Sequence, residues 1–173
     1  MRAKARLLGH PIHQMLIVFP LGLLATSLFF DIAHLSSGNP QWATIAYWLI
    51  AVGIITGLLA AVFGLIDWLA IPQGTRAKRI GLLHGGGNVV VVVLFLGSWL
   101  LRRDDPGNPE GTAVFLSVVA VLLALVTGWL GGELVDRLGV GVDEGANLDA
   151  PSSLKTDHVT ASATASTVPA GRR

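Results

Sequence analysis

The chain has 173 residues, of which 52% are hydrophobic and only 13% charged, too little charge to cover the surface of a soluble domain. The formal net charge is +1, which excludes the broad positive field that nucleic-acid binding requires. Cysteine is absent, which excludes disulfides, iron–sulfur clusters held by this chain and covalently attached c-type haem.

Four long apolar runs dominate the sequence, at about residues 12–34, 43–71, 80–101 and 112–131. A membrane helix needs roughly 20 mainly apolar residues to cross a hydrocarbon core of about 30 Å, and all four runs are long enough. Pro20 lies inside the first run and predicts a kink there. The sequence therefore predicts an all-α, integral membrane four-helix bundle over residues 1–142. A disordered tail rich in Ser, Thr, Ala and Pro is expected over residues 143–173.

Basic residues are distributed unevenly around these runs. Six of them precede the first run or fill the second loop, namely Arg2, Lys4, Arg6, Arg76, Lys78 and Arg79. The first loop has no Lys or Arg, and the third has Arg102 and Arg103. Because cytoplasmic loops carry an excess of Lys and Arg, we expect both termini on the cytoplasmic side of the inner (plasma) membrane.

In this topology, polar residues from all four helices meet at the cytoplasmic edge. His10 and His13 open the first span, Asp67 lies near the end of the second, His84 lies about one turn into the third, and Glu133 follows the fourth. An unpaired ionisable group in hydrocarbon costs about 2.5–3.5 kcal/mol on insertion scales, so such groups face the bundle interior and find partners. The sequence therefore predicts one His and carboxylate cluster at this edge.

Two functional interpretations of this cluster are open. Neutral imidazole is the commonest metal ligand, and His13 with His84 on different helices could hold a b-type haem that serves electron transfer. Alternatively, a divalent metal ion could be bound by residues from the whole cluster, His10, His13, His84, Asp67 and Glu133. Asn88 lies one turn after His84 on the same helix face and is a candidate supporting residue.

A structural interpretation competes with both. The ring of His13 would then bond a backbone group, and Asp67 would pair with Arg76 or Arg79 across the loop. At the other end of the first span, Asp31 and His34 are three residues apart. We interpret them as an interfacial Asp–His pair, with a cation site as the alternative.

Other function classes find little support. There is no phosphate-binding glycine loop, nucleophile elbow or HExxH motif, so catalysis is not expected. A transporter is the weakest hypothesis, because no inverted repeat is visible and the two halves share no sequence blocks. Glycines at four-residue spacing, such as Gly53 with Gly57, indicate close helix packing, either within the bundle or in a homo-oligomer.

Several blocks of this sequence resemble one family. Residues 9–22, GHPIHQMLIVFPLG, closely resemble the HPxHPxLVxFPIG signature of the domain-of-unknown-function 2231 family, with Gln14 in place of the second proline. The blocks FGLIDW, GLLHG and GWLGGELV resemble its other conserved segments. The resemblance implies a small, four-span, mostly bacterial membrane protein of unassigned function. Some relatives are fused to c-type cytochrome or Rieske domains, which implies redox proteins as partners beside the lipid bilayer.

Overall fold

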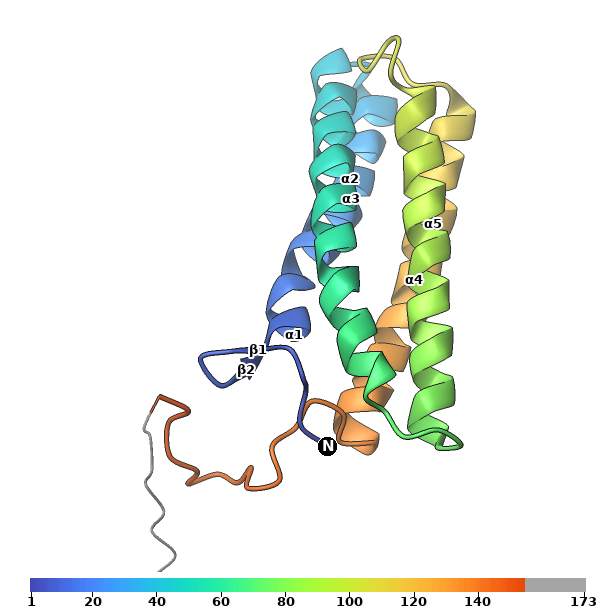
Figure 1. The fold of residues 1–173 in the computed structure, drawn as a ribbon. Coiled ribbons are helices and arrows are strands. Elements are labelled where there is room, and N and C mark those ends of the chain that lie inside the picture. The colour runs from blue at the N-terminus through green and yellow to red at the C-terminus, as the bar shows by residue number, and fades with distance from the viewer. Residues whose placement is uncertain (155–173) are drawn as a thin grey trace, which may run out of the picture.

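The computed structural model describes residues 1–154, and most of the predicted tail, residues 155–173, lies outside the described residues. Four helical segments are long and apolar enough to cross a membrane, and they pack side by side as a bundle (Figure 1). The predicted membrane four-helix bundle is therefore confirmed. The segments comprise α1 (Ile12–Leu16) with α2 (Val18–Ser37), α3 (Pro40–Leu69), α4 (Arg76–Leu101), and α5 (Gly111–Gly132) with the π-helical turn η1 (Glu133–Arg137).

The first span is interrupted where proline chemistry requires it. Pro20 has no N–H to donate to the carbonyl of Leu16, four residues earlier, and its ring crowds that carbonyl. The structure ends α1 at Leu16 and begins α2 at Val18, with Ile17 between them. The break turns the short α1, which carries His13, away from the line of α2 (Figure 1).

Local capping sets the other helix ends. Gly38, with φ of 67°, ends α2 in the left-handed conformation that glycine adopts without strain. Asn39 then caps α3 by accepting a hydrogen bond from the Gln41 amide, with Pro40 at the first helical position. Thr75 caps α4 by accepting from the Lys78 amide at 3.1 Å. These signals place the loops between spans within a few residues of their predicted positions.

The bundle consists of two helical hairpins. Antiparallel neighbours α2 and α3 form the first, which also carries α1, and α4 and α5 form the second (Figure 1). Buried apolar side chains from both hairpins form the core: Leu24, Ile50, Ile54, Val91, Phe95 and Ala120. Large apolar side chains also cover the outside of every helix, as expected for a bundle that faces lipid.

Both ends of the described chain lie at the same end of the bundle as the loop between α3 and α4. A two-residue hairpin, β1 (Arg6–Leu7) with β2 (His10–Pro11), precedes α1, so His10 lies before the first helix. The chain after η1 returns to this segment, where the Gly141 amide donates to the Met1 carbonyl at 2.9 Å and Arg6 pairs with Asp143. The Arg6 hydrogen bond holds the pKa of the Asp143 carboxyl below its ordinary value.

Candidate functional site

His13 is fixed by the second helix of its own hairpin. Its Nδ1 lies 2.8 Å from the carbonyl oxygen of Ala60 on α3, and this bond requires the Nδ1–H tautomer. One turn further along α3, Gly64 leaves space for the ring. A Cβ at Gly64 would lie 2.8 Å from the imidazole Cε1, closer than side chains pack. These contacts therefore fix the position of the His13 ring.

His84 is held in the second hairpin by the same arrangement. Its Nδ1 lies 2.8 Å from the carbonyl oxygen of Thr127 on α5, and a Cβ at Gly131, one turn later, would lie 3.0 Å from its Cε1. Asn88 donates to the His84 carbonyl at 2.8 Å and accepts from the Thr127 hydroxyl at 3.0 Å. Asn88 thus supports the Thr127–His84 contact, in agreement with its expected place on the same helix face.

The two imidazoles meet between the hairpins. Their ring centres are 6.3 Å apart and their planes are nearly perpendicular, at 88°. Because each Nδ1–H is directed at a backbone carbonyl, Nε2 is the acceptor nitrogen of each neutral ring and the atom that could bind a metal. The Nε2 of His84 lies 3.4 Å from the side-chain nitrogen of Asn88. Nδ1 donation to a carbonyl is also the usual way in which a ligating histidine is oriented.

The other predicted ligands have partners of their own. His10 is exposed and lies 3.2 Å from the Ser153 hydroxyl. The Asp67 carboxylate accepts from the backbone amides of Lys4 and Ala5 at 2.6 and 3.0 Å, so the pairing with Arg76 or Arg79 that the structural alternative offered is wrong.

Glu133 also has a partner outside the predicted cluster, because its carboxylate pairs with Arg76 at 2.6 Å. In residues 1–154 no three His, Asp or Glu side chains are grouped to hold one ion. The histidine pair is therefore the part of the predicted cluster that the structure brings together.

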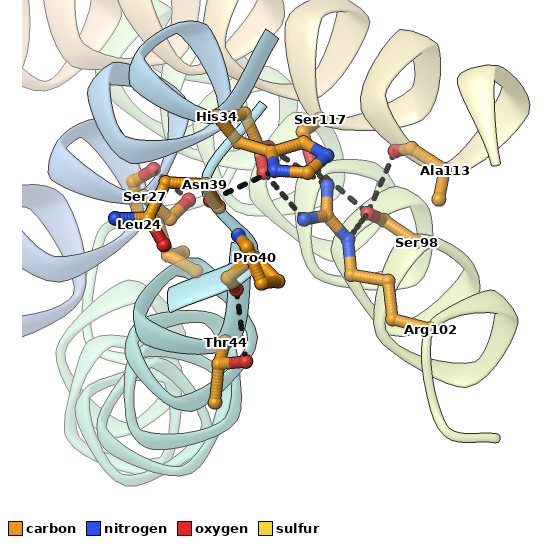
Figure 2. A network of polar contacts seen from close by, with 11 residues as sticks. Leu24, Ser27, His34, Asn39, Pro40, Thr44, Ser98, Arg102, Ala113 and Ser117 are labelled. Carbon is orange, nitrogen blue, oxygen red and sulfur yellow. Dashed lines mark hydrogen bonds and ion pairs between the residues drawn. The ribbon is translucent and has the colours of Figure 1, made fainter. Parts of the chain in front are cut away.

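A second polar cluster, which the sequence analysis missed, lies at the opposite end of the bundle (Figure 2). Arg102 forms two hydrogen bonds with the Asp31 carboxylate, at 2.5 and 2.7 Å, and both side chains are fully buried. The guanidinium also donates to the hydroxyls of Ser98 and Ser117. The predicted Asp31–His34 pair is wrong, because His34 instead bonds the Asn39 carbonyl at 3.0 Å. Two pairs of polar residues at i, i+4 spacing, Ser27 with Asp31 and Ser98 with Arg102, were the available signal.

Comparison with known proteins agrees with the architecture. No curated protein and no solved structure matches the chain. A family model described as a predicted membrane protein, DUF2231, matches residues 9–144, a stretch that contains both histidines, the Asp31–Arg102 pair and all four spans. The chain therefore belongs to the DUF2231 family of membrane proteins.

Proposed function

We propose that this multi-pass membrane protein holds a b-type haem between His13 and His84 and serves electron transfer. The observation that carries the proposal is the imidazole pair, oriented by two backbone carbonyls, with ring centres 6.3 Å apart. If a haem were bound here, His13 and His84 would be the residues that hold its iron, through their Nε2 atoms.

The number of ligands favours haem over a metal ion without a macrocycle. Zinc sites in proteins use three or four protein ligands, whereas a haem iron takes four nitrogens from its ring and needs two at most from the protein. His10, Asp67 and Glu133 have other partners in this structure. A bound haem would supply a one-electron couple, and His13 and His84 would hold it in the orientation that the carbonyls of Ala60 and Thr127 give their rings.

A structural role for the same histidines is the second candidate. Each imidazole already has a hydrogen-bond partner, since His13 bonds Ala60 and His84 bonds Thr127, and such bonds alone satisfy a polar group inside a bundle. On this hypothesis the protein binds no cofactor, and loss of either ring only weakens helix packing.

The proposed setting is the inner membrane, with both termini and the histidine pair on the cytoplasmic side. This orientation is supported by the basic residues at the end of the bundle where the chain starts and where α3 connects to α4. The structure adds to the asymmetry, because Arg102, one of the two cations of the third loop, is neutralised by Asp31 in the interior. Soluble or membrane redox proteins on the cytoplasmic side would be the electron-transfer partners.

The test is the optical spectrum of the detergent-purified protein, oxidised and then reduced with dithionite, with metal content measured on the same sample. A Soret band with sharp α and β bands after reduction, lost in both His13→Ala and His84→Ala, is the expected result. His34→Ala is the matched control, because it removes a histidine at the opposite end and should keep the spectrum.

The other outcomes separate the alternatives. A stoichiometric metal without a Soret band would move the assignment to an ion site. A folded, colourless and metal-free protein from haem-replete cells would refute cofactor binding and leave the histidines as structural residues.

A further inference from the structure

The two hairpins carry the same features at equivalent positions. His84 lies 71 positions after His13, and Arg102 lies 71 positions after Asp31. The same offset relates the three buried residues of α2, Leu24, Ser27 and Asp31, to three buried residues at the end of α4: Phe95, Ser98 and Arg102.

The second helices match with an offset of 67. The carbonyl of Ala60 that bonds His13 corresponds to the carbonyl of Thr127 that bonds His84, and Gly64 corresponds to Gly131. All the buried residues of α5 have buried counterparts 67 positions earlier in α3: Ala113, Val114, Ser117, Ala120 and Thr127 correspond to Ala46, Tyr47, Ile50, Gly53 and Ala60. Both hairpins begin at the end of the bundle where the chain starts (Figure 1), so the matching positions indicate parallel repeats related by an approximate two-fold axis along the bundle.

The contacts between the hairpins join equivalent residues at both ends. His13 meets His84 at one end, and Asp31 meets Arg102 at the other. Equivalent positions face each other only close to a two-fold axis, so both pairs lie near it. The histidine pair has the same residue on each side, but the buried ion pair has opposite charges.

This difference determines which hairpins fit together. If the first hairpin met the first hairpin of another copy, two Asp31 carboxylates would be buried face to face, and two second hairpins would bury two Arg102 side chains. Like charges without partners in a dry interior are strongly unfavourable. The histidines, Ser27 with Ser98, and Leu24 with Phe95 would tolerate either pairing, because each pair matches in polarity.

We propose that the Asp31–Arg102 ion pair, here called the charge key, decides how the two equivalent hairpins associate. Because of it, a first hairpin packs against a second hairpin and not against another first hairpin. The partner can come from the same chain or from another copy. This proposal does not depend on any bound cofactor.

Variants of the 173-residue chain in which the charge at position 31 or 102 is reversed test the charge key. Asp31→Arg and Arg102→Asp each place like charges at the pseudo-axis and should lower the yield of folded, monodisperse protein by at least about tenfold. The double variant D31R/R102D should recover the yield to within about twofold of the original protein, because the key is only inverted. Arg103→Asp and Asp104→Arg are the controls, since both change exposed residues at the same end and should leave the yield unchanged.

The surroundings of positions 31 and 102 differ in one respect, so the charge-inverted double variant is also tested in a second form. Arg102 donates to Ser117, whose counterpart in the first hairpin is Ile50, so an arginine at position 31 would lack one acceptor. Adding Ile50→Ser to D31R/R102D supplies it. If both inverted versions remain as defective as the single variants, or if the single variants fold normally, the proposal is overturned.

Co-expression tests the choice of partner directly. Chains carrying Asp31→Arg and chains carrying Arg102→Asp, each with a different affinity tag, complement each other only by exchanging hairpins between two copies. The expected result is a folded complex that contains both tags, in a larger share than two co-expressed, differently tagged copies of the original sequence give. Failure of the two tags to co-purify in folded protein would contradict the partner selection.

Discussion

Removal of the negative charge from the buried ion pair should be one of the most damaging single changes in this bundle. Asp31→Asn keeps the size of the side chain but leaves the Arg102 guanidinium, which is fully buried, without a counter-charge. Loss of one partner of a buried pair typically costs about 3–5 kcal/mol. Arg102 follows the last residue of α4 and lies near the membrane surface, where its long side chain can reach water when the hairpins loosen. We therefore expect a loss near the lower limit, about 3 kcal/mol, or roughly a hundredfold in the unfolding equilibrium.

The assay is equilibrium unfolding in mixed micelles with increasing dodecyl sulfate, followed by tryptophan fluorescence. Trp99, one of five tryptophans, stacks on Tyr47 across the two hairpins with ring centres 5.3 Å apart, so its part of the emission changes when the hairpins separate. Asp104→Asn is the matched control, because it removes an exposed carboxylate at the same end.

A second variant separates charge burial from general damage. Replacing both partners, in Asp31→Leu with Arg102→Met, removes the ion pair without leaving a lone charge and should destabilise less than Asp31→Asn alone. A loss below about 1 kcal/mol in Asp31→Asn, the value typical of exposed pairs, would refute the reasoning. It would mean that water reaches Arg102 in the folded bundle.

Three further predictions concern the terminal end. Gly64→Ala should lower the free energy of unfolding by about 1–3 kcal/mol, because the added Cβ displaces the His13 ring. The same unfolding assay measures it, and Gly128→Ala, where a Cβ meets nothing within 4 Å, should cost far less. Asp67→Ala should speed hydrogen exchange at the amides of Lys4 and Ala5 about tenfold or more, because it removes their shared acceptor; unchanged exchange would show that the segment is held by other contacts. The depressed pKa of Asp143 gives stabilisation that is present above the unfolded value of about 3.9 and is lost as pH falls through the lower folded value. The Arg6 side-chain NMR signal should therefore hold its position to about pH 4 and move only below it, and loss of the contact at pH 5 would contradict the assignment.

The architecture could be predicted because lipid restricts the backbone so strongly. Four apolar runs admit only helices in a membrane, and caps such as Asn39 with Pro40 mark the turns. The meeting of His13 and His84 followed from topology, since both spans start at the same edge and both histidines lie near the start of their apolar runs. The predicted kink at Pro20 likewise rests on one local rule, the missing N–H.

The remaining contacts depend on chain geometry that no local pattern encodes. Asp67 was a candidate ligand, with a basic loop residue as its alternative partner, but the N-terminal segment folds back and its Lys4 and Ala5 amides bond the carboxylate instead. Arg102 was counted as a loop cation, because nothing near it in sequence shows that its partner lies 71 residues earlier. The equivalence of the two hairpins was missed, since only scattered identities mark it in the sequence, such as His13 with His84 and Ser27 with Ser98.

The distance along the chain between Asp31 and Arg102 also sets a delay during synthesis. At about 5–20 residues per second, the 71 residues that separate them take roughly 4–14 s to emerge from the ribosome. Through that interval the first hairpin is in the membrane with an acidic group that has no partner. Every newly made copy therefore passes through a half-built stage in which Asp31 awaits its counter-charge, and the first hairpin completes its interior only when the second hairpin arrives.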